Sequence, residues 1–303
     1  MARKITEAVI IGYGAMGQRH GKNLIELGVR VVARADPAFT HPFDLAMDYS
    51  DSDKCLTDKA KGRLVVITSP SHLHAYHAVK AMYCGAGALY IEKPMCTNLP
   101  DADDIQELSK ELGIPVAVGY NFRAHPGFHA LIKLIQTPNF FFGAYGIDDP
   151  TTWPTYKRFG LDSYICAETG GVLWTSASHA IDMAIALLGR VHNLIASYTP
   201  TQGAVALRLF HAAGGVSTVY NKWMQGHDRT SLLTYTSVED SITVDLLMDP
   251  PPEMHKHFME NVLKNFQTSD DGLLVPTMAE AYHGVEVLVA AEKSIRQKEY
   301  VVV

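Results

Sequence analysis

The feature that most constrains this chain is a set of three glycines, Gly12, Gly14 and Gly17, spaced as G-x-G-x-x-G. They follow a short apolar run over residues 8–11 and precede a segment with helical periodicity. At such a junction the first glycine permits a tight turn. The second lets a ligand approach the backbone, and the third allows close helix–strand packing. The pattern therefore predicts a strand–turn–helix unit whose helix N-terminus faces a phosphate group.

An acidic residue, Asp36, follows the second strand-like run, residues 30–35, and lies 19 residues after Gly17. In a dinucleotide-binding βαβ unit, an acid at this position accepts hydrogen bonds from the adenine ribose. Asp36 favours NAD, because a carboxylate repels a 2′-phosphate, but Arg34 can point to the same side and keeps NADP open. The predicted cofactor is thus NAD, with NADP as the alternative. The loop and ribose ligands expected for it are Gly12, Tyr13, Gly14, Ala15, Met16, Gly17 and Asp36.

Strand-like and helix-like segments alternate through the first part of the chain. After the second run, they cover residues 64–68, 72–82, 88–91, 101–112 and 116–118. Short apolar strands separated by helices are typical of a parallel sheet covered on both faces. We expect a poorly regular crossover over residues 36–63. The prediction for residues 1–122 is an α/β fold, a doubly wound Rossmann sheet.

The pattern changes at about residue 123. Three β-rich segments, 191–199, 204–223 and 230–247, follow one another without intervening helices, and Gly214–Gly215 splits the second into a hairpin. Helical patterns cover residues 123–135, 171–188, 253–267 and 277–297. Consecutive strands indicate an antiparallel sheet. Residues 123–303 are therefore expected to form an α+β domain with an open antiparallel sheet.

Composition narrows the class of protein. The 303 residues suit two domains, and 47% hydrophobic with 19% charged residues is ordinary for a globular protein. A formal net charge of −6 argues against a nucleic-acid or membrane-surface protein. The four cysteines lack CxxC spacing, no long apolar span occurs, and the first residues read as a strand rather than a signal peptide. We expect a cytoplasmic protein with a small-molecule partner.

Two further motifs stand where strands of the predicted parallel sheet end. They are Thr68-Ser69-Pro70 and Glu92-Lys93-Pro94. The carboxyl ends of such strands line the cofactor crevice. A lysine beside a nicotinamide can take a proton from a hydroxyl or donate one to a carbonyl, which hydride transfer requires. Lys93 is therefore a candidate catalytic residue, although position alone equally fits a surface lysine in a turn.

The motifs together resemble the glucose–fructose oxidoreductase/inositol dehydrogenase (Gfo/Idh/MocA) family. The similar stretches are Gly-Tyr-Gly-Ala-Met-Gly with Gln-Arg-His, Thr-Ser-Pro-Ser-His-Leu-His, Glu-Lys-Pro, Gly-Tyr-Asn-Phe-Arg, Gly170-Gly171 with His179 and Asp182, and Phe258 to Ser294. The resemblance covers nearly the whole chain. It implies a Rossmann domain, an α/β domain often used for oligomerisation, and a nicotinamide-dependent oxidoreductase acting mostly on polyols or sugars.

The resemblance also assigns residues. The family's Glu-Lys-Pro lysine falls on Lys93 and its second-domain histidine on His179, while Thr175 replaces the usual aspartate four residues earlier. Threonine cannot hold the charge that would raise the basicity of His179, so a strong general base there is in doubt. Asp182 either orients His179, with which it shares a helix face, or pairs with a basic neighbour.

Weaker candidates complete the expected site. Further cofactor ligands are expected at Thr68, Ser69, Pro70, His74, Glu92, Lys93 and Arg123. Substrate contacts are expected from Lys93, Tyr120, Arg123, Trp153, Thr175 and His179. Arg123 equally suits a role at the domain junction, and Trp153 equally suits a core position. The histidines 72, 74 and 77 look like a metal pattern, but the first two are two residues apart at a helix start and no partner carboxylate is evident. Capping and packing at the cofactor edge suit them better, so no metal is expected.

The sequence thus favours an NAD(P)-dependent dehydrogenase or reductase acting on CH–OH groups of sugars, cyclitols or related compounds. Two alternatives stay open. One is a dinucleotide-binding regulator or sensor, which Thr175 permits; the other is a hydrolase that uses bound NAD as a redox relay. The long strands of the second domain offer a broad sheet face that needs covering, so we expect a homodimer or homotetramer.

Overall fold

The computed structural model describes residues 4–38, 48–134, 141–149, 171–199, 203–224, 226, 228–236, 241–246, 253–268 and 274–303. The chain divides into two compact units. The first contains Met1–Tyr120 and His255–Met278, and the second contains Asn121–Met254 and Ala279–Val303. The expected boundaries, 1–122 and 123–303, differ from this division mainly in one segment, because His255–Met278 belongs to the first unit.

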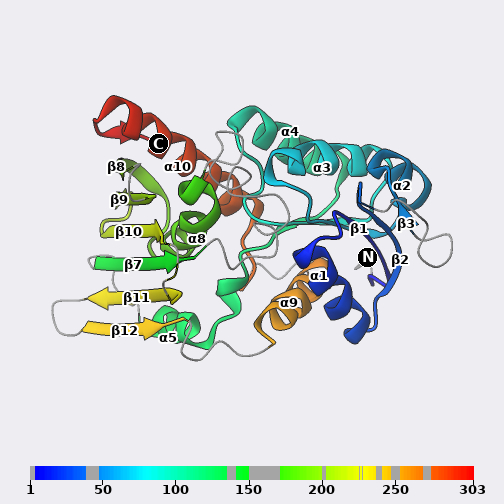
Figure 1. Cartoon of the computed structure of the whole chain (residues 1–303), viewed down its shortest axis with the longest axis horizontal. Coiled ribbons are helices and arrows are strands. Elements are labelled where there is room, and N and C mark those ends of the chain that lie inside the picture. Colours follow the sequence, from blue (N-terminus) through cyan, green and yellow to red (C-terminus); the bar gives the residue numbers. More distant parts are fainter. Residues whose placement is uncertain are drawn as a thin grey trace. The chain divides into compact units, whose positions relative to one another are not determined.

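The first unit is built on a parallel sheet with the strand order β3-β2-β1-β4-β5-β6 (Figure 1). Its strands are β1 (Glu7–Ile11), β2 (Arg30–Ala35), β3 (Asp48–Tyr49), β4 (Leu64–Ile67), β5 (Ala88–Ile91) and β6 (Val116–Val118). Every residue of β4 and β5 is buried, as expected for central strands covered on both faces. The predicted doubly wound sheet is confirmed.

Helices cover both faces of this sheet. They are α1 (Ala15–Glu26), α2 (Ser52–Lys59), η1 (Ser71–Leu73), α3 (His74–Tyr83), α4 (Leu99–Leu112) and α9 (Met254–Thr268). Figure 1 shows α2, α3 and α4 on one face and α1 beside α9 on the other. Arg19 Nη1 lies 2.9 Å from His255 Nε2, and Lys256 pairs with Glu26 at 3.0 Å, so α9 is tied to α1.

One expectation for the first unit was wrong. Residues 36–63 do not form only an irregular crossover, because the described part contains β3 and α2. The Asp51 side chain accepts hydrogen bonds from the backbone N–H groups of Asp53 and Lys54, which satisfies donors at the start of α2. The run of acids in this stretch therefore includes a helix cap.

The second unit contains a seven-stranded sheet with the order β12-β11-β7-β10-β9-β8-β13. Its strands are β7 (Phe141–Asp148), β8 (Val191–Thr199), β9 (Ala204–His211), β10 (Val216–Trp223), β11 (Thr230–Thr236), β12 (Ser241–Asp245) and β13 (Val301–Val302). The sheet is mixed rather than antiparallel throughout, because β7 and β10 run parallel. Their connection is long and contains a helix, which permits parallel pairing, whereas the other neighbours pair antiparallel.

Among its described residues, the second unit has the helices η2 (Asn121–Ala124), α5 (Pro126–Leu134), the π-helical turn η4 (Leu173–Ala177), α8 (Ser178–Leu188) and α10 (Met278–Gln297). The helix expected over 123–135 is interrupted, since α5 begins at Pro126, a residue suited to a helix start. Buried and half-buried residues alternate along β10, so one face of the sheet meets the core and the other does not. Within the described residues, no helix has the length and apolarity needed to span a membrane.

Candidate functional site

The candidate nucleotide site lies where the strands of the first sheet end. Ile11 is in register with Ile67 of β4, and Ile67 with Ile91 of β5. The next residue of each strand continues the ladder: Thr68 N donates to Ile11 O and Glu92 N to Ile67 O, both at 2.8 Å. The glycine loop, the Thr68 loop and the Glu92–Lys93 turn therefore emerge together at one edge, as predicted.

The glycine loop has the geometry of a phosphate cradle. Gly12 has a φ of 88°, and a Cβ there would lie 2.6 Å from the Ser69 nitrogen; a Cβ on Gly17 would collide with the Gly12 carbonyl oxygen. At Gly14 a Cβ would meet nothing within 4 Å, and no side chain caps α1. Two glycines thus allow close packing. The third leaves open space at a helix N-terminus, which fits a dinucleotide pyrophosphate.

Asp36 contacts the same loop. Its carboxylate accepts hydrogen bonds from Tyr13 N and Ala38 N, each at 2.9 Å, and the residue is 9% exposed. The carboxylate is thus fixed at the end of β2 beside the glycine loop. This position fits the expected role of binding the adenine ribose.

Arg34, the residue that keeps NADP open, is already engaged by an acid. Its Nε and Nη2 donate to the two carboxylate oxygens of Asp48, with Nη2–Oδ2 at 2.9 Å. Its Cζ lies 4.5 Å from the centroid of the Tyr13 ring, in a cation–π arrangement. Arg34 therefore belongs to an ion pair between β2 and β3.

The Glu92–Lys93 turn is anchored through Glu92. The Glu92 carboxylate lies 2.6 Å from His20 Nε2 and accepts hydrogen bonds from the Tyr90 hydroxyl and Lys93 N, both at 3.2 Å. Burial would raise the pKa of Glu92, but the contact with His20 outweighs it and lowers the pKa to about 2. An ionised carboxylate only accepts, so His20 Nε2 carries the proton. Glu92 thus holds the backbone of Lys93, and no cofactor contact is needed to explain it.

A second buried histidine anchors the other side of the turn. His74 is 1% exposed, with Nδ1 2.8 Å from Pro94 O and Nε2 2.8 Å from Ser69 O. Burial lowers the pKa of His74, and the two carbonyl contacts oppose part of that shift. With both ring nitrogens in contact with backbone carbonyls, His74 joins the loops after β4 and β5. The expected contact of His74 with the cofactor stays a prediction. Ser69 Oγ contacts the neighbouring His77 at 2.9 Å.

In the second unit, Arg123 is enclosed by acids. It is 0% exposed, binds both oxygens of Asp182 at 2.8 and 2.7 Å, and lies 3.3 Å from Glu280. Burial raises the pKa of Asp182, and the Arg123 contact acts in the opposite direction. A guanidinium occupied in this way has no edge to offer a ligand. The expected cofactor and substrate contacts of Arg123 are therefore not supported, and Asp182 pairs with a basic neighbour, one of its two predicted roles.

His179 lies in a stretch that is otherwise closed. Between residues 172 and 185 every residue is buried except His179, which is half-buried. Its ring centroid is 4.7 Å from that of Phe122. The Thr175 hydroxyl donates to Gly171 O at 2.7 Å, within the π-helical turn that precedes α8. Thr175 thus serves its own helix, and the expected substrate contact of this 8% exposed residue is not supported.

The remaining predicted residues differ in what they offer. Tyr120 is buried at 2% exposure, which does not support the predicted substrate contact. Trp153 lies outside the described residues. Pro70 and Ala15 are exposed, whereas Thr68 donates a hydrogen bond to Gly12 O and so links two loops. No three His, Cys, Asp or Glu side chains in the described ranges are grouped as metal ligands.

Sequence reasoning gave no role to His20. A signal was present, because Gly17, His20, Gly21 and Leu24 form the buried stripe of α1. A histidine within such a stripe needs a buried polar partner. Gly119 also belongs to this cluster, since a Cβ there would lie 2.6 Å from the Tyr90 hydroxyl.

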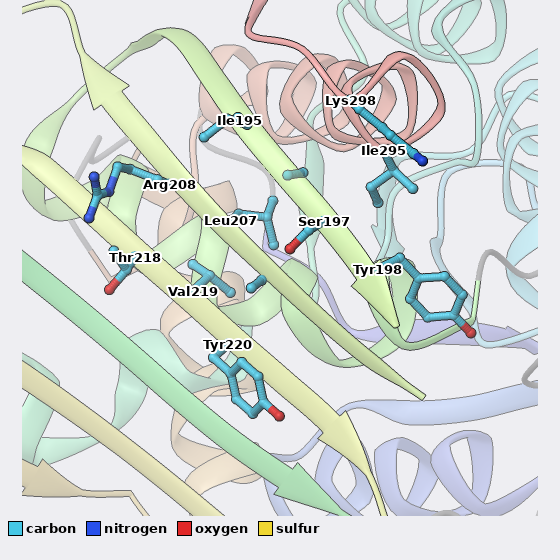
Figure 2. Close-up of a pocket in the computed structure, with 12 residues that line it drawn as sticks. Ile195, Ser197, Tyr198, Leu207, Arg208, Thr218, Val219, Tyr220, Ile295 and Lys298 are labelled. Atoms are coloured by element: carbon cyan, nitrogen blue, oxygen red, sulfur yellow. The ribbon is translucent and has the colours of Figure 1, made fainter. Parts of the chain in front are cut away.

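A separate groove of about 560 Å³ lies on the second sheet (Figure 2). Strand residues such as Ile195, Arg208 and Tyr220 line it, with Ile295 and Lys298 from the end of α10. Nearby, the rings of Tyr145 and Tyr220 stack at 5.3 Å. The groove contains none of the predicted site residues.

Comparison with known proteins identifies the first unit. Residues 6–120 match the model of the GFO_IDH_MocA oxidoreductase family, described by its NAD-binding Rossmann fold. These residues of the chain belong to the Gfo/Idh/MocA family. The family description agrees with the glycine loop, Asp36 and the parallel sheet. The resemblance seen in the sequence is thereby confirmed.

Two curated proteins from Bacillus subtilis strain 168 are similar to this chain. The NADP(+)-dependent scyllo-inositol 2-dehydrogenase IolW is 24% identical over 192 residues, covering 59% of this chain and 51% of the relative. The NAD(+)-dependent scyllo-inositol 2-dehydrogenase is 25% identical over 193 residues, covering 59% and 53%. The matches thus span about half the length of these curated relatives.

A similar solved structure is myo-inositol 2-dehydrogenase from Lactobacillus plantarum. It has a TM-score of 0.83 and 15% identity, and covers 99% of this chain and 100% of its own. At this identity the likeness shows the fold alone. It extends over both units.

Proposed function

We propose that this chain is an NAD(P)-dependent dehydrogenase or reductase acting on a CH–OH group of a cyclitol, sugar or related compound. The observation that carries the proposal is the shared edge of the first sheet, where the open glycine cradle, Asp36 and the turn bearing Lys93 emerge together. The relatives' names, scyllo-inositol and myo-inositol dehydrogenases, support the substrate class.

The residues of this edge suit hydride transfer coupled to proton transfer. The glycine cradle would hold the pyrophosphate and Asp36 the adenine ribose. A bound nicotinamide would supply the hydride acceptor for oxidation of a carbinol carbon and the hydride donor for reduction of a carbonyl carbon. In the oxidising direction, a neutral Lys93 amine takes the hydroxyl proton while the C–H electron pair leaves as hydride; in reduction, its ammonium returns the proton. We assign His179 a supporting role in the same reaction.

The first test is a paired titration of the purified protein with NADH and NADPH, followed by nicotinamide fluorescence. We expect binding in the micromolar range or tighter, with NADH preferred because Asp36 disfavours a 2′-phosphate. A turnover screen of inositols and sugars with NAD(+) and NADP(+) follows. Failure of both nucleotides to bind would remove the basis of the proposal.

A second function is favoured by one specific observation. Thr175 and Asp182 are both committed to partners other than His179, as expected if the chain binds a dinucleotide and ligand without turnover. The Lys93 turn favours the enzyme. Nucleotide binding without turnover of any polyol or sugar would favour the sensor, and product formed without added cofactor would favour the hydrolase.

We also propose that the open face of the second sheet joins copies of this chain. The stacked Tyr145–Tyr220 pair, the 38% exposed Phe141 and the groove of Figure 2 support this, because monomers rarely leave such a face uncovered. Sedimentation at micromolar concentration tests it. A monomer would contradict the proposal.

A further inference from the structure

We propose that Asp48 is a specificity residue for the cofactor, which makes the ribose end of the site select NAD by holding the Arg34 guanidinium in a two-point ion pair. The inference rests on the proposed function, because it concerns how the same site distinguishes two nicotinamide cofactors. It assigns this discrimination to a residue of β3, in addition to the acid at the end of β2.

The position of Arg34 relates it to the ribose. Arg34 lies in β2 and Asp36 directly follows the strand, where its N–H donates to Tyr49 O at 3.0 Å and continues the ladder. Residues two apart in this extended backbone direct their side chains to the same face of the sheet. Both reach Tyr13 of the glycine loop: Asp36 accepts its backbone N–H at 2.9 Å, and the Arg34 guanidinium lies 4.5 Å from its ring centroid. An arginine at this place is the group that accommodates a 2′-phosphate in NADP-binding Rossmann folds.

The ion pair occupies the Nε–Nη2 edge of Arg34, one of the two edges through which a guanidinium makes a two-point contact with a phosphate. Arg34 and Asp48 are direct neighbours in the register of β2 and β3. The Nε and Nη2 groups, the fork that binds carboxylate or phosphate through two parallel hydrogen bonds, both donate to Asp48. The Asp48 side chain is 1% exposed and that of Arg34 is 28% exposed, so the pair is shielded from competing water on the Asp48 side.

Charge acts in the same direction. Asp36, Asp48 and Arg34 together place one net negative charge beside the glycine loop. A phosphate group brings roughly 1.5–2 negative charges at neutral pH, so it meets repulsion instead of a cation. The two Bacillus subtilis relatives differ in cofactor at nearly equal identity, 24% and 25%, so overall similarity does not decide the preference. In our proposal, the charges of Arg34, Asp36 and Asp48 decide the cofactor preference.

The test compares dissociation constants for NADH and NADPH in the wild type and in Asp48→Asn. The substitution removes the charge and keeps the shape, so Arg34 loses its ionic partner. We expect the NADPH dissociation constant to fall about tenfold, equivalent to about 1.4 kcal/mol, while that for NADH changes less than about twofold. The gain in NADPH binding should shrink as salt is added, since it arises from charge.

Three further variants make the result specific. Asp58→Asn is the matched control, because Asp58 is exposed on α2 and its recorded partner is Tyr49 rather than Arg34. It should leave the NADPH to NADH ratio unchanged. Arg34→Gln alone should weaken NADPH binding, since Asp48 and Asp36 are then uncompensated. Adding Arg34→Gln to Asp48→Asn should abolish the gain.

The outcomes separate this inference from the proposed function. A wild type that binds neither nucleotide would overturn both. A wild type that binds NADH, with an unchanged ratio in a folded Asp48→Asn protein, would overturn the inference alone. So would a gain that persists without Arg34. If Asp48→Asn does not fold, Arg34→Gln decides, because unchanged NADPH binding there would contradict the charge argument.

Discussion

The two candidate catalytic residues, Lys93 in the first unit and His179 in the second, differ in what the neighbouring buried polar groups hold in place. The Lys93 turn is held on one side by Glu92, which His20 contacts at 2.6 Å, and on the other by His74. The two residues that share a helix face with His179 bind other groups: Asp182 pairs with Arg123, and Thr175 donates to Gly171 O. In the first unit, buried polar groups therefore fix the turn that carries Lys93. In the second unit, they fix the helix that carries His179 and make their hydrogen bonds to other groups. We infer that proton transfer depends mainly on Lys93.

The largest expected effect concerns Lys93 itself. Lys93→Met should lower kcat by about 10²–10⁴-fold, because the variant has no group to exchange the proton. The NADH dissociation constant should change little. Lys54→Met, at an exposed position on α2, is the control for loss of a lysine charge. Turnover that survives Lys93→Met would remove the lysine from the reaction and end the comparison.

The second prediction tests whether the ion pair of Asp182 with Arg123 stabilises the protein. Arg123→Met should destabilise the protein by about 3–5 kcal/mol, because it leaves the buried Asp182 carboxylate uncompensated. Denaturant unfolding measures this. The matched control is Arg190→Met, whose ion pair with Glu286 is 60% exposed at the arginine and should be worth at most about 1 kcal/mol. Equal losses in the two variants would mean that the buried pair is not structural.

The third prediction concerns the anchor of the lysine turn. Glu92→Gln should reduce kcat about tenfold, equivalent to about 1.4 kcal/mol, while KM and the NADH dissociation constant stay within about twofold. The reason is that the buried Glu92 carboxylate accepts a hydrogen bond from Lys93 N and so positions the turn that carries the lysine. Exposed Glu107→Gln on α4 is the control. A loss confined to KM, or to NADH affinity, would assign Glu92 to binding instead.

The fourth prediction sharpens the comparison directly. His179→Asn should lower kcat less than about tenfold, well below the effect of Lys93→Met, since neither Thr175 nor Asp182 is placed to raise its basicity. Steady-state kinetics on the same substrate compares the two. A loss as large as that of Lys93→Met would show that the histidine works without these supports and would make the two units equal partners.

Local patterns carried the prediction of the first unit. The glycine spacing and the apolar runs were sufficient to predict the parallel sheet, because both depend on neighbouring residues in the sequence. The residues that hold the site were harder to predict. His20 and Glu92 are 72 positions apart, and Arg123 and Asp182 are 59 apart. Only the packed structure brings such partners together.

The second unit shows the same limit at the level of strands. The β-rich runs after residue 191 were evident, but the pairing of β10 with β7 is parallel and joins segments separated by a long connection. Hydrophobic alternation fixes which face of a strand is buried and leaves its neighbour and direction open. Sequence patterns therefore predicted most strands of this sheet, but they did not predict the parallel pairing of β7 with β10.

The smallest expected effect is a pH dependence in which the two units behave alike. His77 in the first unit and His211 in the second are buried, and burial lowers the pKa of each to about 4. Each ring is matched in its neutral form: His77 lies between Ser69 and Ser52 hydroxyls, and His211 between a carbonyl and a hydroxyl. The unfolded chain takes up the proton near pH 6.5, before the folded chain does.

Stability should therefore fall as the pH drops from 6.5 toward 4, and each histidine should contribute about 1 kcal/mol of this loss by pH 5.5. Unfolding free energies at pH 7.5 and 5.5 measure it in the wild type, His77→Gln and His211→Gln. In each variant, the unfolding free energy should differ less between pH 7.5 and pH 5.5 than it does in the wild type, whatever the absolute stability of the variant. Exposed His72→Gln, which replaces a histidine that is not buried, is the control. If only one variant reduces the pH dependence of the unfolding free energy, then only the histidine of that unit makes the protein sensitive to acid, and the two units do not behave alike.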